Sequence, residues 1–194
     1  MKNSKLTTRK IVTIALLAAL TTAGSALRIK IPVSFVGTSA FHLGNIMCAL
    51  SGILLGPWAG GLAAGLGSAI YDMFDPLYIS ECWITFLTKG AYGLVAGLVA
   101  WGGKTAWDAH SPKSCAKAYL AAVTGAVTYA VIYLSKSFFY NGLLLSGLTP
   151  ATAWVTVIDK LPATVFNAAI AIIAAPLLAI AISKALEKNH LSPQ

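Results

Sequence analysis

The segment Glu81–Trp101 places a lysine inside an apolar run that is long enough to cross a membrane as a helix. About 20 residues at 1.5 Å each span a hydrocarbon core of about 30 Å. Lys89 lies near the middle of this run, where a lysine costs about 2.5 to 3.5 kcal/mol on insertion scales. Its side chain must therefore face protein or water. Helical spacing predicts a polar face that comprises Glu81, Thr85, Thr88, Lys89 and Tyr92.

The composition extends this conclusion to the whole chain. It is 57% hydrophobic and only 10% charged, whereas soluble domains carry about 25% charged residues. The net charge of +8 comes mostly from basic residues between the apolar segments, and not from a patch with interleaved aromatic residues. That distribution is typical of loops beside a lipid bilayer and excludes nucleic-acid binding.

The apolar segments predict an all-α membrane protein, with one domain over residues 1–194. We expect six transmembrane helices, at residues 8–27, 41–55, 58–74, 81–101, 116–145 and 153–186. The segment Ile31–Ala40, with Pro32 and Gly37, is expected to be a loop. Six spans put both termini on one side, and the excess of Lys and Arg on that side places it in the cytoplasm.

Polar and aromatic residues converge on the outer half of these helices. Lys89 with Glu81, and Lys136 with Asp159, are candidate ion pairs, but intramembrane ionisable residues more often line a site or a pathway. We therefore expect a ligand pocket that opens on the extracellular side. The candidate ligand-binding residues are Arg28, Phe35, His42, Asn45, Tyr71, Asp72, Tyr78, Glu81, Lys89, Tyr92, Tyr133, Lys136, Tyr140, Lys160 and Asn167.

The sequence carries no enzyme signal: it has neither an H-E-x-x-H motif nor a phosphate-binding loop, and its cysteines lack metal-ligand spacing. We expect no catalytic residue, no metal and no intrinsic cofactor. Ala15, Ala19 and Ala23 recur every fourth residue in the first helix, a pattern that lets another helix approach closely. A stand-alone secondary transporter or channel is the alternative class, although the two halves show no inverted repeat.

Several stretches together identify a family. The alanine line of the first helix, the block FHLGNIMCALSGILLGPWAGGLAAGLGSAIYDMFDP and the Lys-Gly pair of the fourth helix resemble the substrate-binding S component of energy-coupling-factor (ECF) vitamin transporters, a type of ABC importer. The resemblance implies an outward-facing pocket under a lid, here Ile31–Ala40. It also implies a coupling transmembrane subunit docked on Ala15, Ala19 and Ala23, two cytoplasmic ATPase subunits that use ATP, and a multi-pass location in a prokaryotic cell membrane.

The sequence restricts the identity of the vitamin less than it restricts the family. The F-H-L-G-N and D-P-x-Y-I stretches resemble the cobalamin (vitamin B12) branch most, so cobalamin is the leading expectation. Pantothenate remains open because its carboxylate suits Arg28, Lys89 or Lys136. Pyridoxine remains open because it suits the tyrosines.

Overall fold

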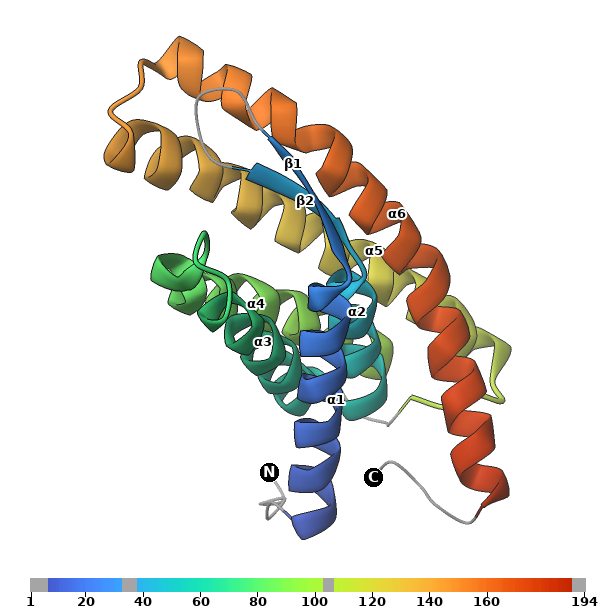
Figure 1. Ribbon diagram of the computed structural model, residues 1–194. Coiled ribbons are helices and arrows are strands. Elements are labelled where there is room, and N and C mark those ends of the chain that lie inside the picture. The colour runs from blue at the N-terminus through green and yellow to red at the C-terminus, as the bar shows by residue number, and fades with distance from the viewer. Residues whose placement is uncertain (1–6, 33–37, 103–106, 190–194) are drawn as a thin grey trace.

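The computed structural model describes residues 7–32, 38–102 and 107–189, and within these ranges the chain is almost entirely helical (Figure 1). The elements follow in the order α1 (Thr8–Ala26), β1 (Arg28–Pro32), β2 (Thr38–His42), α2 (Gly44–Leu55), α3 (Pro57–Met73), the 3₁₀ helix η1 (Ile79–Glu81), α4 (Cys82–Trp101), α5 (Pro112–Lys136), the π-helix η2 (Ser137–Leu145) and α6 (Pro150–Lys188). The start of α1 and the end of α6 lie at the same end of the molecule (Figure 1).

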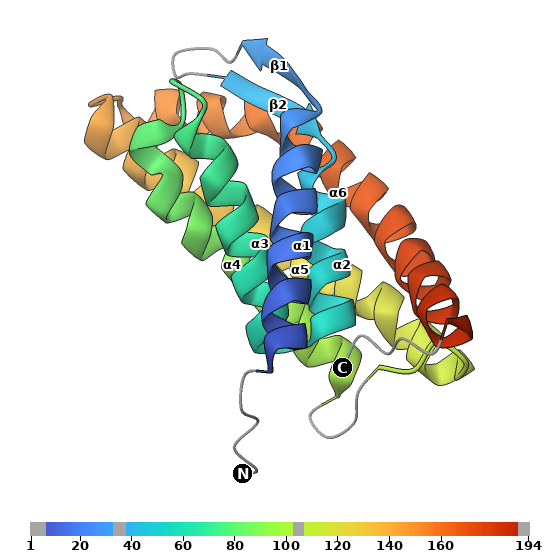
Figure 2. The same ribbon diagram turned by 60° about the horizontal axis from the view of Figure 1, so that its bottom comes forward.

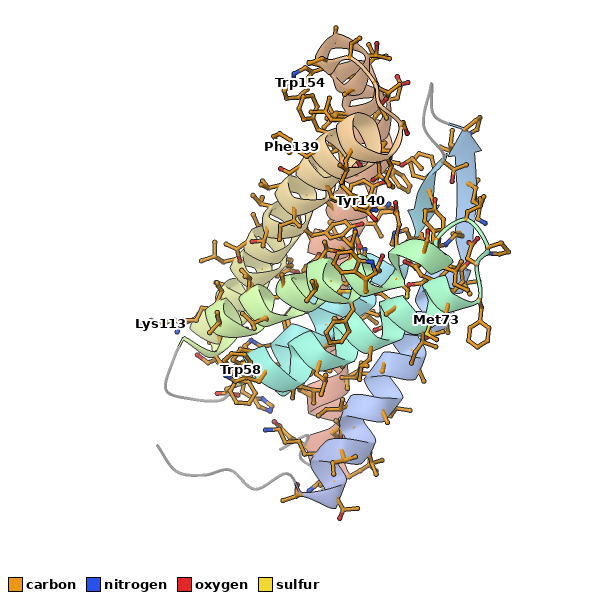
Figure 3. All side chains as sticks on the ribbon, turned by 90° about the vertical axis from the view of Figure 1, so that its left-hand side faces the viewer. Trp58, Met73, Lys113, Phe139, Tyr140 and Trp154 are labelled. Carbon is orange, nitrogen blue, oxygen red and sulfur yellow. The ribbon has the colours of Figure 1, made fainter. Side chains whose placement is uncertain are left out.

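Among the described residues, four helical segments are long and apolar enough to cross a membrane: Thr8–Ala26, Ile79–Trp101, Pro112–Leu145 and Pro150–Lys188. Exposed tryptophans lie toward opposite ends of the molecule, with Trp58 80% and Trp154 56% exposed (Figure 3). Amphipathic aromatic rings favour the two membrane–water interfaces. The length and apolarity of these helices, together with the exposed tryptophans, indicate a multi-pass membrane protein.

The short helix α2 forms the centre of the bundle. It packs against α1, α3, α4, α5 and α6, and nearly all of its residues are buried. With 12 residues it is about 18 Å long, little more than half of a hydrocarbon core about 30 Å thick. Space therefore remains beyond its N-terminus, and the β-hairpin lies at that end of the molecule (Figure 2).

The segment expected to be a loop is partly a hairpin. Strands β1 and β2 pair antiparallel, from Arg28 opposite His42 to Pro32 opposite Thr38. Pro32 ends β1, a position that tolerates a residue without an N–H. Because β2 extends to His42, α2 begins at Gly44 and not at Phe41 as predicted.

The fifth helix differs from the single α-helix expected over 116–145. Pro112 occupies the first turn, where its missing N–H costs nothing, so α5 begins four residues earlier. After Lys136 the chain changes to the π-helix η2, which continues to Leu145.

Two further helix starts differ from the predicted ones. A 3₁₀ turn ends at Glu81, so α4 begins at Cys82. Thr149 accepts a hydrogen bond from the Thr152 N–H at 3.3 Å, and this cap starts α6 at Pro150 instead of residue 153. The long α6 contains Pro162 and Pro176 and follows a curved path (Figure 1).

Candidate ligand cavity

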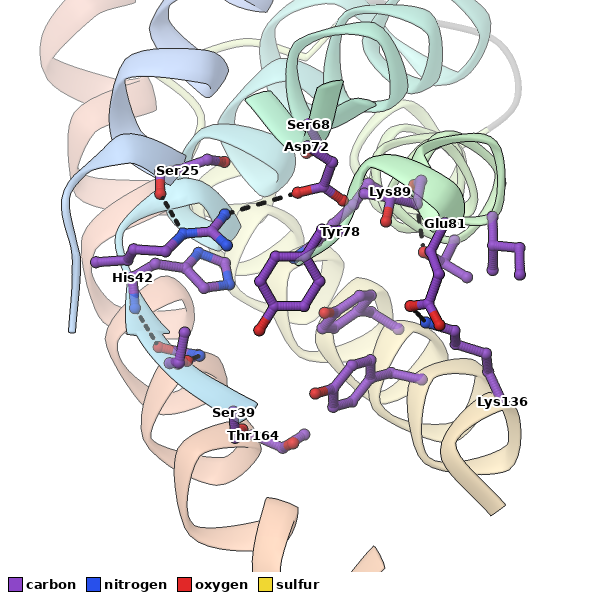
Figure 4. Close-up of a pocket in the computed structure, with 18 residues that line it drawn as sticks. Ser25, Ser39, His42, Ser68, Asp72, Tyr78, Glu81, Lys89, Lys136 and Thr164 are labelled. Carbon is purple, nitrogen blue, oxygen red and sulfur yellow. Dashed lines mark hydrogen bonds and ion pairs between the residues drawn. The ribbon is translucent and has the colours of Figure 1, made fainter. Parts of the chain in front are cut away.

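A polar cavity lies between the hairpin, the end of α1 and the hairpin-side halves of α3 to α6 (Figure 4). Its volume is about 80 Å³. The residues that line it are Ser25, Arg28, Ser39, Ala40, His42, Ser68, Asp72, Tyr78, Glu81, Ile84, Thr85, Thr88, Lys89, Tyr129, Tyr133, Lys136, Thr164 and Asn167. Hydroxyl groups, aromatic rings and paired charges thus share one space.

Arg28 is held at the foot of the hairpin by partners on three sides. Its Nε donates to the Ser25 carbonyl at 2.8 Å, and its two terminal nitrogens lie 3.8 Å from carboxylate oxygens of Asp72 and Asp75. Its guanidinium carbon lies 3.9 Å from the centre of the Tyr71 ring, a cation–π contact. Arg28 therefore reaches the cavity with its charge already balanced by carboxylates.

Lys30 and Asp75 tie the hairpin to the connection between α3 and α4. Lys30 Nζ lies 2.7 Å from Asp75 Oδ2, and the hydroxyls of Thr38 and Tyr78 lie 2.7 Å apart. The hydrogen bond to Asp75 raises the pKa of Lys30 above its usual 10.5. Burial by itself would raise the pKa of Asp75, but the hydrogen bonds and charges of its neighbours, Lys30 first among them, lower it below 3.8. Both groups are ionised at neutral pH.

Asn167 of α6 holds the other edge of the hairpin. Its Nδ2 donates to the Ala40 carbonyl at 2.8 Å, and its Oδ1 accepts from the His42 N–H at 3.0 Å. His42 Nδ1 accepts from the Gly44 N–H at 3.1 Å, so a neutral His42 carries its proton on Nε2. Asn167 and His42 thus close the cavity on the side of α6 and β2.

Lys89 lies at the deep end of the cavity and is only 4% exposed. Its Nζ donates to Asn45 Oδ1 and lies 3.7 Å from the centre of the Tyr129 ring. The ion pair with Glu81 that the sequence suggested is absent among the described residues, because Glu81 contacts another lysine. An amide oxygen and a tyrosine face stabilise this ammonium group instead.

Three tyrosines stack from the core toward the cavity. The Tyr92 and Tyr129 ring centres are 5.9 Å apart and those of Tyr129 and Tyr133 are 5.5 Å apart, with nearly parallel planes. Tyr92 is fully buried, and its hydroxyl has no partner among the described residues. Tyr129 and Tyr133 reach the cavity, so the stack presents aromatic surface to whatever occupies it.

Glu81 crosses from the start of α4 to α5 and η2. One carboxylate oxygen pairs with Lys136 Nζ and the other accepts from Asn141 Nδ2. Figure 4 shows Glu81 and Lys136 together at the wall of the cavity. Lys136, a candidate partner of Asp159 in the sequence, thus pairs with Glu81.

The structure brings most of the predicted candidates to one cavity. Those that line it are Arg28, His42, Asp72, Tyr78, Glu81, Lys89, Tyr133, Lys136 and Asn167. Others lie behind the wall: Asn45 and Tyr71 hold Lys89 and Arg28, Tyr92 extends the tyrosine stack, Tyr140 packs edge-on against Trp83, and Lys160 donates to Ser137 Oγ. Phe35 lies outside the described residues.

Several lining residues were not among the candidates. Thr85, Thr88, Tyr129 and Thr164 fall on polar helix faces, so helical spacing could have selected them. Ser25, Ser39 and Ser68 carry no such signal, because isolated serines are common in membrane helices and turns. Only the folded arrangement places them at the cavity.

The predicted docking face of α1 is open in the structure. Ala15, Ala19 and Ala23 are all exposed, whereas Leu17, Thr21 and other residues of the opposite face are buried. Their exposure leaves the alanine line free to contact another chain.

Comparison with known proteins gives one family match. A model of the "ECF-type riboflavin transporter, S component" family matches residues 5–184. The chain is also similar to an "Uncharacterized protein in gap 3'region" of Pyrococcus woesei, at 29% identity over 124 residues, which cover 64% of this chain and 74% of that protein.

The family match points to a riboflavin branch and not to the cobalamin branch expected from the sequence. The two stretches behind that expectation have local roles in the structure. In F-H-L-G-N, His42 bonds to Gly44 and Asn45 to Lys89; in D-P-x-Y-I, Asp75 pairs with Lys30.

Proposed function

The chain belongs to the family of S components of ECF-type vitamin transporters, and from this premise we propose that it captures riboflavin at the outer face of a cell membrane. The match over residues 5–184 is the observation that carries the proposal. In this role the chain binds the vitamin and does not hydrolyse ATP.

The chemistry of the cavity supports a flavin. Riboflavin combines a flat aromatic ring system with a chain of hydroxyl groups. Tyr129 and Tyr133 offer stacked ring surfaces, and aromatic pairs favour such offset contacts. Serine and threonine hydroxyls from five elements can donate to or accept from the hydroxyl chain. Cobalamin, which is far larger, fits this space much less well.

The size of the cavity indicates how a ligand enters. A cavity of about 80 Å³ is smaller than the roughly 300–1,000 Å³ of typical ligand pockets, so the walls have to move apart. The hairpin is the segment we expect to move, because Lys30–Asp75, Thr38–Tyr78 and Asn167 attach it through polar contacts. Its described residues overlap the lid predicted at Ile31–Ala40, of which residues 33–37 lie outside the described part of the chain.

The full transporter requires partners and a fixed orientation. We propose six membrane-embedded helices with both termini in the cytoplasm of a prokaryotic cell, as the distribution of basic residues predicts. A coupling transmembrane subunit would dock on Ala15, Ala19 and Ala23, and two ATPase subunits would supply energy. The chain itself needs no metal or resident cofactor for this role.

Binding by the purified chain tests the proposal. Riboflavin fluorescence should be quenched on titration with detergent-solubilised protein, and calorimetry should give a one-to-one ratio. Cobalamin, pantothenate and pyridoxine are the comparison ligands, and mass spectrometry identifies any vitamin that co-purifies. Tight binding of one of these in place of riboflavin would refute the assignment. ATP-independent riboflavin accumulation in vesicles that contain this chain alone would instead favour a secondary transporter.

A further inference from the structure

Both carboxylate oxygens of Glu81 accept hydrogen bonds at the cavity wall. Lys136 Nζ pairs with one oxygen and Asn141 Nδ2 donates to the other. The side chains of Glu81 and Lys136 are only 13% and 14% exposed, so the pair is largely shielded from water. The ammonium group and the amide N–H that bind this carboxylate could bind another anion in the same place.

The π-helix explains how Lys136 and Asn141 reach the same carboxylate. In an α-helix, residues five apart point about 140° away from each other. In a π-helix, where the C=O of residue i accepts from the N–H of residue i+5, residues five apart point more nearly to the same side. The change from α5 to η2 directly after Lys136 therefore aligns the two donors on Glu81.

A second lysine adds positive charge behind this site. Lys160 of α6 is 5% exposed and donates to Ser137 Oγ, in the first turn of η2, at 3.2 Å. Its Nζ lies 5.7 Å from the centre of the Tyr133 ring, which lines the cavity. Glu81 and Lys136 are close enough to interact electrostatically with Lys160. Without the Glu81 carboxylate, the wall would present the Lys136 ammonium group, with Asn141 and Lys160 behind it.

We propose that Glu81 is a specificity-determining residue that excludes ligands with an anionic group at this end of the cavity. Its carboxylate occupies Lys136 and Asn141 and repels a phosphate or carboxylate that approaches them. A neutral ligand leaves the pair intact, whereas an anionic one must displace Glu81. This inference rests on the proposed binding of a flavin, and it predicts which form of the flavin is accepted.

The test compares riboflavin with riboflavin 5′-phosphate in the wild-type chain and in E81Q. Gln keeps the size of Glu but removes its charge. We expect the wild type to prefer riboflavin, and E81Q to shift the affinity ratio toward the phosphate ester by about 10- to 100-fold, the range of a charge-assisted hydrogen bond. An unchanged ratio in E81Q overturns the proposal.

Matched variants keep the test decisive if E81Q is unstable. E81Q/K136M removes both charges of the pair, so it should fold without an uncompensated lysine and should lose the gain for the phosphate ester. K136M alone retains Glu81 and should discriminate against the ester even more strongly than the wild type. Equal affinities for the ester in E81Q and E81Q/K136M contradict a role for Lys136.

Inorganic phosphate separates this inference from the proposed function. Millimolar phosphate, at constant ionic strength, should raise the thermal unfolding midpoint of E81Q but not that of the wild type or of E81Q/K136M. If the wild type binds no flavin, the proposed function fails, while the phosphate result still decides whether Glu81 blocks an anion site. Protection of all three proteins to the same extent overturns the inference.

Discussion

Gly60→Ala should destabilise the bundle because the added methyl group meets backbone. Gly60 of α3 is buried against α2, and a Cβ there would lie 2.5 Å from the Ser51 carbonyl oxygen and 2.5 Å from Gly52 Cα. Backbone atoms cannot rotate away as side chains can, so the two helices must separate. Overpacking of this kind costs about 1–3 kcal/mol, and a backbone clash belongs near the upper end.

The helix propensity of alanine offsets part of that cost. Replacing glycine by alanine inside a helix gains about 0.8–1.0 kcal/mol, so the net loss for Gly60→Ala is about 2 kcal/mol. In a chain of this length that corresponds to a fall of about 4–8 °C in the thermal unfolding midpoint. The midpoint can be followed in detergent by the circular dichroism of the purified protein.

Gly90→Ala is the matched control. A Cβ at Gly90 of α4 would lie 3.5 Å from the Gly61 carbonyl oxygen, an ordinary contact, and 4.0 Å from Gly65 Cα. This variant should therefore keep the propensity gain and unfold about 2–4 °C higher than the wild type. The close-packing argument is refuted if both variants move in the same direction, or if Gly60→Ala is the more stable of the two.

Three other substitutions test the cavity, the docking face and the hairpin. Lys89→Met should change the free energy of unfolding by no more than about 2 kcal/mol. Removing a buried charge is favourable, and this offsets the cost of leaving Asn45 Oδ1 without its donor. Calorimetry should show that the variant binds the vitamin at least tenfold more weakly. A larger stability loss would mean that Lys89 is chiefly structural. Ala15→Leu with Ala19→Leu should abolish vitamin uptake by the complete transporter but preserve binding by the isolated chain; loss of both would indicate that the line packs within the protein. The ion pair between Lys30 and Asp75 should tie down the hairpin over a wide pH range. Because the pKa of Asp75 is lowered, the stability that Asp75 contributes is lost only as pH falls below 3.8. Because the pKa of Lys30 is raised, the stability that Lys30 contributes is lost only as pH rises above 10.5. Asp75→Asn should remove both dependences from hydrogen exchange of the hairpin amides, and an unchanged pH profile in this variant would contradict the tether.

The order of the helices could be read from the sequence because apolar runs and basic connections are local signals. The polar face of α4 could be read in the same way, since helical spacing groups Thr85, Thr88 and Lys89. The family resemblance to S components is likewise confirmed by the match over residues 5–184. These features depend on neighbouring residues or on the pattern of the whole chain.

Features that depend on pairing between residues far apart in the chain could not be predicted from the sequence. The hairpin joins Arg28 to His42 across a segment whose Pro and Gly content indicates only a loop. The sequence SFFYNGLLL of η2 is compatible with an ordinary α-helix, and nothing in its periodicity marks a π-helix. Which acid meets which lysine was also open, because Glu81 lies 55 residues from Lys136 and only eight from Lys89.

The short length of α2 explains how polar residues can lie inside the helix bundle. A short central helix leaves a gap at membrane depth, and the hairpin, the tyrosine stack and the hydroxyl groups fill its sides. Lys89 then faces Asn45 and Tyr129 and avoids lipid, so its insertion cost is met by contacts within the protein. The residue that conflicts most with a membrane helix is therefore the one that marks the depth of the cavity, and a ligand that reaches it must compete with Asn45 for the same ammonium group.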